Sequence, residues 1–466
     1  MQNSKLLELL RGFSGREWKS FRDFVNSPYF NRNGDVTALC NLLEDKSGNS
    51  DTLQREAVFR ELFPGQAFDD ARLNHLMSFL LKLAERFLGL ERTNSHAPFT
   101  LSFHTLQALL ERGLEKHYRY AVEQVRKKQN TNPYHDATFF LQRYQVEDFE
   151  AGYLSRSAGR RFNESVQLAA DHLDQFYLAE KLRCTCYMLT SQVVLATPYN
   201  LQLVEEVRRF VAALREPEPI VQAYYLITCL LTDPAAFSDF EALKLLLTEQ
   251  ERHFPPPVLA ELYQYAINYC NLQILKNHEP FVAEALDWYT RGVQSGILLE
   301  QGKLSPWHFK NMIKLGLRLK KYAWTEQFIR DNTGLLEPEF RDDAFHYNLA
   351  ELYYYTGRSG EAQEQLNQVE FTDIHYNLGA KVILCKIFYE TGELDALESL
   401  LHAFRAYLHR NRVIAEDLRQ PYLHFTAILR RITRSTSKDA AALRDRIDRT
   451  VLAEKNWLLK VLDQDF

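Results

Sequence analysis

The stretch AFHYNLAELYYYTGRSGEAQEQLNQV, residues 344–369, decides the fold of this chain. Its apolar and small residues form two groups on either side of Gly357, and each group keeps the i, i+3, i+4 spacing of one helix face. Glycine adopts the left-handed conformation that is common just past a helix C-terminus. The stretch therefore predicts two amphipathic helices joined by a tight turn. The residues that define the two faces are Leu349, Ala350 and Tyr353 before the glycine and Ala362, Leu366 and Val369 after it.

The plan of this stretch recurs on both sides of it. Gly392 lies 35 residues after Gly357, and the upstream copies lie 34 residues before their counterparts. A period of about 34 residues with two helices per unit is typical of tetratricopeptide repeats (TPRs), and the resemblance covers residues 305–408. The upstream unit turns early into its second helix, residues 324–332, and no unit ends in proline, so the repeats are degenerate. The other repeated positions are Leu384, Cys385, Phe388, Leu397, Leu401 and Phe404 downstream and Leu315, Gly316 and Leu319 upstream.

The composition is that of a folded, helical chain. Apolar residues make up 46% of its 466 residues, which excludes a mostly disordered protein. The 56 basic and 61 acidic residues leave a net charge of −5, which indicates no particular class of partner. The six cysteines have no disulfide or zinc spacing and predict buried thiols in a reducing compartment. The N-terminus has the pattern of a helix rather than of a signal peptide, and the longest apolar run, residues 224–231, is too short to cross a bilayer, so we expect a cytoplasmic protein with no membrane partner.

Glycine and proline divide the rest of the chain into helices. Ser14 and Glu17 form a capping-box pattern, and Ser305 with Pro306 predicts the start of the first recognisable repeat. Residues 102–130 predict one charged helix, and no segment has the period of a strand. The sequence therefore predicts an all-α protein. Its four segments are an N-terminal helical bundle (1–95), an irregular helical-hairpin solenoid (96–304), TPR-like repeats (305–408) and C-terminal capping helices (409–466).

Two further sets of residues carry a wider resemblance. The first combines WKSFRDFVNSPYFN with VFRELFPG and RLNHLMSFLLKL, and the second combines LSPWHFKN with EFTDIHYNL and GELDALESLLHAFRAYL. Together they resemble a Bacteroidota family of helical-repeat proteins with TPR-like repeats, over nearly the whole chain. The resemblance implies a cytoplasmic, all-helical bacterial protein and assigns it no activity.

The repeat pattern also predicts a groove. In TPR proteins the first helix of each unit faces the concave side, so the resemblance places tyrosines and lysines there. Lysines supply charge and tyrosines supply rigid contact area, so the groove is expected to hold an acidic peptide or a partner domain. The alternative is that the tyrosines pack between helices and the lysines form a solvated face. The predicted groove residues are Lys310, Lys320, Lys321, Tyr347, Glu351, Tyr354, Tyr355, Lys386, Tyr389 and Glu390.

A second class of function is suggested near the N-terminus. Residues 53–87 resemble the helix–turn–helix segment of bacterial regulators that couple a winged helix to TPRs, with residues 69–90 as the recognition helix. That helix offers Arg72, Lys82 and Arg86 as basic residues, but acidic residues accompany them, and residues 91–102 show no wing hairpin. A structural bundle is therefore the preferred interpretation, and a nucleic-acid partner is not expected.

No familiar catalytic motif is present. The sequence contains no G-x-x-x-x-G-K, G-x-G-x-x-G, H-E-x-x-H or G-x-S-x-G pattern, so it predicts no catalytic residue and no cofactor. The string HYNL occurs at His346 and at His375, near Glu370 and Asp373, and two helix starts explain it better than a metal site. The sequence predicts a non-enzymatic interaction or scaffold protein. A DNA-binding regulator with a TPR-like sensor domain is the alternative, and an enzyme without a familiar motif is the third hypothesis.

Overall fold

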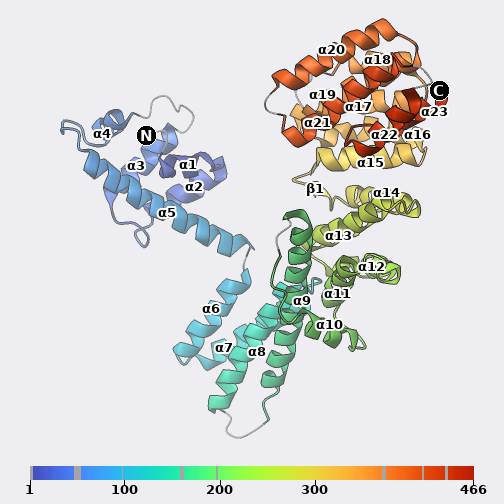
Figure 1. Ribbon diagram of the computed structural model, residues 1–466. Helices are drawn as coiled ribbons and strands as arrows, with labels where there is room; N and C mark the ends of the chain where they lie inside the picture. Colours follow the sequence, from blue (N-terminus) through green and yellow to red (C-terminus); the bar gives the residue numbers. More distant parts are fainter. Residues whose placement is uncertain are drawn as a thin grey trace. The chain divides into compact units, whose positions relative to one another are not determined.

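The chain folds almost entirely into helices (Figure 1). The structure, a computed structural model, describes residues 4–46, 54–96, 98–157, 162–195, 198–369, 374–411, 414–435 and 439–465. Within these residues there are 23 α-helices, so the predicted all-α class is confirmed. The chain divides into two compact units, Met1–Asn132 with Phe139–Leu173, and Pro133–Thr138 with Asp174–Phe466. The four segments predicted from the sequence are a finer division and stay a prediction.

The first five helices bury one apolar cluster that runs from Leu6 to Phe87. The predicted capping box is confirmed at the start of α2, where the Glu17 amide donates to the Ser14 hydroxyl and the Ser14 amide donates to the Glu17 carboxylate. This exchange satisfies two amides that the first turn of a helix leaves unpaired. The helices are α1 (Lys5–Arg11), α2 (Gly15–Asn26), α3 (Gly34–Asp45), α4 (Arg55–Leu62) and α5 (Asp70–His96).

The single helix predicted over residues 102–130 is wrong. Gly113 adopts a φ of +68° and separates two helices that pack against each other. The Leu114 amide donates to the Leu109 carbonyl across this turn, which is the bond that closes a helix end at a left-handed glycine. A helical spacing of apolar residues on both sides had hidden the break. The helices of this region are α6 (Pro98–Glu111), α7 (Glu115–Asn130), α8 (Ala137–Ser157) and α9 (Glu164–Leu195).

Helix hairpins build the middle of the second unit, where α11 packs on α12 and α13 packs on α14. A two-stranded hairpin, β1 (Leu299–Glu300) with β2 (Lys303–Leu304), corrects the prediction that no strand exists. Its turn residues Gln301 and Gly302 both have positive φ, as two-residue hairpins favour, and strands this short carry no readable period. The elements are α10 (Val204–Ala212), α11 (Pro219–Thr232), α12 (Phe237–Gln250), the 3₁₀ turn Glu251–His253, α13 (Pro256–Leu275) and α14 (Pro280–Gln294).

The repeat stretch folds as its pattern predicts. Gly357 and Gly392 have φ of +75° and +78°, just past the ends of α17 and α19, so the predicted left-handed glycines are confirmed. Ser305 caps α15 and Pro306 is its first residue, also as predicted. The elements are α15 (Pro306–Arg318), α16 (Tyr322–Asn332), the 3₁₀ turn Thr333–Leu335, α17 (Pro338–Tyr355), α18 (Ser359–Leu366), α19 (Ile374–Glu390), α20 (Leu394–Arg410), α21 (Glu416–Ile432), α22 (Ala440–Arg449) and α23 (Lys455–Asp465).

The close approach of α17 to α19 depends on Gly379. A Cβ at this position would lie 2.5 Å from the Tyr347 hydroxyl oxygen and under 3.0 Å from two ring carbons. Tyr347 is buried, so its ring has no room to move aside. Gly379→Ala is therefore expected to destabilise the protein by roughly 1–3 kcal/mol, measured by urea denaturation. Gly360→Ala on α18, where a Cβ meets nothing within 4 Å, is the control, and an equal loss in both variants would contradict the packing argument.

Candidate partner-binding surface

Three helices of the second unit bring most of the predicted groove residues together. Helix α17 packs against both α15 and α19. Tyr347 and Glu351 lie one turn apart on α17, as Lys386 and Glu390 do on α19. Lys310 of α15 holds its Nζ atom 5.7 Å from the centre of the Tyr347 ring, within the range of a cation–π interaction. We call the following set the inner cluster: Lys310, Tyr347, Glu351, Tyr354, Lys386, Tyr389 and Glu390.

The chain's own C-terminal segment contacts the inner cluster. Lys386 Nζ donates to a carboxylate oxygen of Glu454, at 2.5 Å, just before α23 begins. The Trp457 indole N–H on α23 and the Tyr354 hydroxyl both donate to Glu390 Oε1, at 2.8 and 2.7 Å. Glu454 has a φ of +56°, which is uncommon for a residue other than glycine and is typical of positions that the surrounding structure constrains. The inner cluster therefore binds, in cis, a helix start that carries a carboxylate and an indole.

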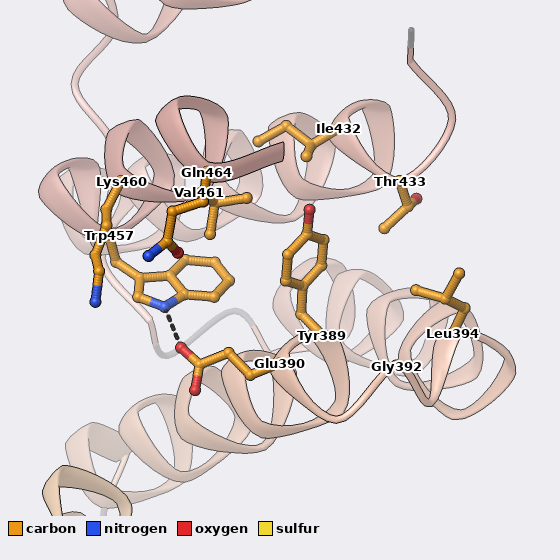
Figure 2. A pocket seen from close by; sticks show the side chains of 10 residues that line it. All are labelled: Tyr389, Glu390, Gly392, Leu394, Ile432, Thr433, Trp457, Lys460, Val461 and Gln464. Atoms are coloured by element: carbon orange, nitrogen blue, oxygen red, sulfur yellow. Dashed lines mark hydrogen bonds between the residues drawn. The ribbon is translucent and has the colours of Figure 1, made fainter. Parts of the chain in front are cut away.

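A cavity of about 450 Å³ lies beside this contact (Figure 2). Figure 2 shows the Trp457 indole N–H directed at Glu390, with Tyr389 standing next to the indole. The two rings meet edge to face, with centres 5.7 Å apart, an arrangement that stabilises aromatic pairs. Lys460 and Gln464 of α23 add polar groups to the lining. The cavity therefore offers aromatic walls and a polar lining where α19 and α23 meet.

Charge is buried in the inner cluster. Lys386 is only 7% exposed, and its ammonium is paired with Glu454 and lies 5.5 Å from the Tyr354 ring centre. Burial raises the pKa of the Glu351 carboxyl, while Lys314, Lys310 and Lys386 act in the opposite direction. Its Oε2 atom is buried and has no hydrogen-bond partner among the described residues. The neighbouring lysines therefore favour the charged form of Glu351, whereas its burial favours the neutral form.

The raised pKa of Glu351 predicts how the stability of the protein depends on pH. A carboxyl whose pKa is higher in the folded state binds its proton more tightly when folded, so stability falls as the pH rises above the ordinary value of 4.5. Glu351→Gln is therefore expected to raise the unfolding midpoint at pH 7.5, and the gain should shrink as the pH falls toward 4.5. Thermal unfolding followed by circular dichroism between pH 8 and pH 5 measures this. The exposed Glu364→Gln is the control at pH 7.5, and a loss of stability in Glu351→Gln would contradict the argument.

Three predicted residues lie outside the inner cluster. Lys320 and Lys321 form the exposed turn between α15 and α16, and Lys320 has a φ of +56°. Tyr355 is 52% exposed at the end of α17. Lys314, one turn after Lys310 on α15, is also exposed and was missed by the sequence reasoning. The spacing of four residues between Lys310 and Lys314 indicates that both lie on one face of the helix, because residues i and i+4 share a helix face.

Glu454 and Trp457 were also missed. Lys386 stands among apolar residues in the sequence ILCKIF, and a lysine on an apolar face needs a counter-charge. That signal predicts a partner carboxylate without saying which one, since Glu454 lies 68 residues away. The sequence reasoning placed Tyr347 and Lys386 on an accessible groove, whereas both are buried in the structure.

Two of the three basic residues that the DNA-binding alternative requires, Arg72 and Arg86, contact other side chains of the first unit. The Arg72 guanidinium donates to Asp35 Oδ2 and to Gln66 Oε1, both at 2.9 Å, and stacks on the Phe63 ring. Arg86 lies 4.9 Å from the Phe30 ring centre. These two arginines therefore bind groups of their own unit, which reduces what α5 offers to phosphate.

The described part of the chain contains neither a metal-binding cluster nor a membrane-spanning helix. No cluster there has three or more His, Cys, Asp or Glu side chains placed to hold a metal ion. Of the four residues around the HYNL strings, Glu370, Asp373 and the His375 side chain lie outside the described part, while His346 Nδ1 lies 2.9 Å from Gln365 Oε1. No described helix combines the length and the apolar character needed to cross a membrane. Five of the six cysteines are buried free thiols, as predicted, but the prediction is wrong for Cys184, which is exposed.

Comparisons with protein-family models, with curated proteins and with solved structures find no match. The resemblances to TPR proteins and to the Bacteroidota family stay expectations. The contacts of the inner cluster therefore carry the proposed function.

Proposed function

We propose that this chain is a non-enzymatic interaction or scaffold protein, with a TPR-like solenoid after an N-terminal helical bundle, that binds a protein segment beside the inner cluster. The observation that supports this is the way α23 is held. Its start engages Lys386 through Glu454 and Glu390 through Trp457, so the face of α19 that carries these two residues already accepts a helix start with an acidic residue and an aromatic one. Helix-in-groove recognition uses such spaced anchors.

The accessible surface next to the inner cluster is basic and aromatic. We call it the outer patch and define it as Lys314, Lys320, Lys321 and Tyr355, all exposed. Helix α15 and the turn after it carry the three lysines, and α17, which packs against α15, carries the tyrosine. Such a set favours an acidic segment, because opposite charges attract and an aromatic ring supplies contact area without much loss of side-chain entropy. The partner is therefore expected to be an acidic segment of another protein that also carries an aromatic residue.

Charge reversal of the outer patch tests this function. The variant Lys314→Glu/Lys320→Glu/Lys321→Glu is used as bait in native lysate beside the wild type, and captured proteins are identified and then purified for binding measurements. We expect an acidic partner that binds the wild type, weakens at high salt, and loses at least about tenfold in affinity with the variant. The matched control, Lys19→Glu/Lys116→Glu/Lys127→Glu, makes the same charge change on exposed lysines of the first unit and should bind normally.

The outcomes separate the proposals. If a partner binds both charge-reversed variants as tightly as it binds the wild type, the outer patch is not its binding site. Duplex DNA that co-purifies instead, and is lost in Arg72→Ala/Lys82→Ala/Arg86→Ala, would favour the DNA-binding regulator. Circular dichroism of every variant must match the wild type, since the comparison requires folded proteins.

A further inference from the structure

The outer patch leaves a neighbouring feature unused, the cavity of about 450 Å³ where α19 meets α23 (Figure 2). The buried part of its lining is apolar, since Ile432 of α21 and Val461 of α23 are 2% and 4% exposed. Three polar residues of the lining, Glu390, Lys460 and Gln464, are exposed and so lie toward solvent. A pocket with an apolar floor and a polar mouth is typical of the places where a protein interface takes up an anchoring side chain.

Two aromatic rings and an exposed leucine form the walls of this cavity. Tyr389 and Trp457 are partly exposed, and their rings meet edge to face with centres 5.7 Å apart. Leu394, the first residue of α20, is 51% exposed. In Figure 2, Tyr389 and Leu394 stand on one side of the cavity and Ile432 lies across from them. An apolar side chain that enters from solvent would cover Leu394 and contact the rings, and burial of such surface is favourable.

A chain of contacts connects the cavity to the outer patch. The Tyr355 ring of the outer patch meets the Tyr354 ring, with centres 5.9 Å apart. The Tyr354 hydroxyl donates to Glu390 Oε1, at 2.7 Å, and Glu390 lines the cavity. In the other direction, Tyr355 interacts electrostatically with Tyr322, which directly follows Lys321. The turn after α15, the end of α17 and the cavity at the end of α19 therefore form one continuous surface.

The packing of the three helices sets the length of this surface. Helix α15 packs against α17, and α17 packs against α19. Packed helices lie about 8–10 Å apart, so about 16–20 Å separates the turn after α15 from the cavity. An extended chain needs about six residues to span that distance. One segment can therefore reach the lysines and the cavity together only if its two contacts are separated by about that length.

We propose that the cavity takes up an aromatic side chain of the same acidic segment that binds the outer patch. The acidic residues of the segment lie over Lys314, Lys320 and Lys321, and its aromatic side chain enters between Tyr389 and Leu394. An aromatic residue suits the cavity because it buries a large apolar area and pairs with the aromatic walls. The inference rests on the proposed function and adds to it a second contact and the spacing between the two contacts.

Three fluorescein-labelled peptides test the proposal on the full-length chain by fluorescence anisotropy. The first carries four acidic residues, a linker of six glycines and serines, and a tryptophan. The second has alanine in place of the tryptophan, and the third keeps the tryptophan but has a linker of one residue. The wild type is expected to bind the first peptide about tenfold more tightly than either of the others, because only the first fills the cavity while its acidic residues stay on the lysines.

Crosslinking locates the aromatic side chain without any variant of the protein. Benzoylphenylalanine replaces the tryptophan of the first peptide, and the complex with the wild type is irradiated. Mass spectrometry is expected to find the peptide attached to residues that line the cavity, Leu394 and Ile432 among them. This measurement does not depend on the folding of a substituted chain.

Two substitutions assign the preference to the cavity. Leu394→Asp removes an apolar wall, and an acidic residue suits the first turn of a helix, so α20 should still form. This variant is expected to lose the tenfold preference for the tryptophan peptide over the alanine peptide. Leu245→Asp makes the same change at an exposed leucine of α12 and should keep the preference.

The outcomes separate this inference from the proposed function. If the wild type binds the tryptophan and alanine peptides equally, if the crosslinks form outside the cavity, or if Leu394→Asp keeps the preference, the inference is wrong and the outer patch stands alone as the proposed site. If no peptide binds at millimolar concentration, the inference is also wrong. The capture experiment with the charge-reversed variant then decides the proposed function independently.

Discussion

Arg126→Met is expected to destabilise the first unit by about 2–3 kcal/mol, because it leaves the buried Glu147 carboxylate without the charged donor that pairs with it. Glu147 is 4% exposed, and Arg126 is partly exposed. Among the described residues, Arg126 donates both hydrogen bonds that the Glu147 carboxylate receives from charged nitrogens, at 3.1 and 2.7 Å. Methionine preserves the packing of the arginine stem but leaves a buried carboxylate without its counter-charge. Urea denaturation followed by circular dichroism measures the loss.

A double-mutant comparison isolates the cause. Arg126→Met/Glu147→Leu removes both charges and is expected to recover most of the stability, because a buried ion pair contributes little over apolar residues of similar size. The exposed Lys127→Met, next in sequence, should change the free energy of unfolding by no more than about 0.5 kcal/mol. If Arg126→Met lay within 1 kcal/mol of the wild type, about the accuracy of such measurements, the ion pair would not anchor α7 to α8.

Leu458→Ala is expected to destabilise the second unit by about 2–5 kcal/mol, the range for truncating a fully buried leucine. Leu458 of α23 is completely buried in the apolar cluster that α19, α20 and α21 also build. Loss of its side chain leaves a cavity and weakens the attachment of α23, so the indole of Trp457 should also become more exposed. Thermal unfolding measures the first effect, and the fluorescence maximum of the tryptophans reports the second.

The control for this variant lies two residues away. Asn456→Ala changes an exposed side chain of the same helix and is expected to alter neither the melting temperature nor the fluorescence. A full loss of stability with unchanged fluorescence would show that α23 stays on the inner cluster when its core anchor is weakened. In that case the contact with Glu454 and Trp457 would itself hold the helix in place.

Local sequence patterns predicted the helical elements well. The left-handed glycines that end α17 and α19, the capping box at Ser14 and the Ser305–Pro306 helix start were all predicted correctly. Each of these features involves residues within about four positions of one another, and the physical rule that governs each is local. The errors were local features that a helical period hides. Gly113 lies inside an amphipathic pattern, and the strands at Leu299 and Lys303 are two residues long.

The sequence by itself determined that the chain is all-α, because the spacing of apolar residues sets which face each helix must bury. It also gathered Tyr347, Tyr354 and Lys386 as candidates for one surface, through the repeat period.

Only the tertiary structure decided what those residues do. Lys386 meets Glu454 over a separation of 68 residues, and Glu390 meets Trp457 over 67. Judged from the neighbouring sequence alone, many carboxylates along the chain are equally good partners for Lys386. Which one is chosen depends on how the packing of whole helices brings distant charges out of water together, and no spacing along the sequence encodes that choice.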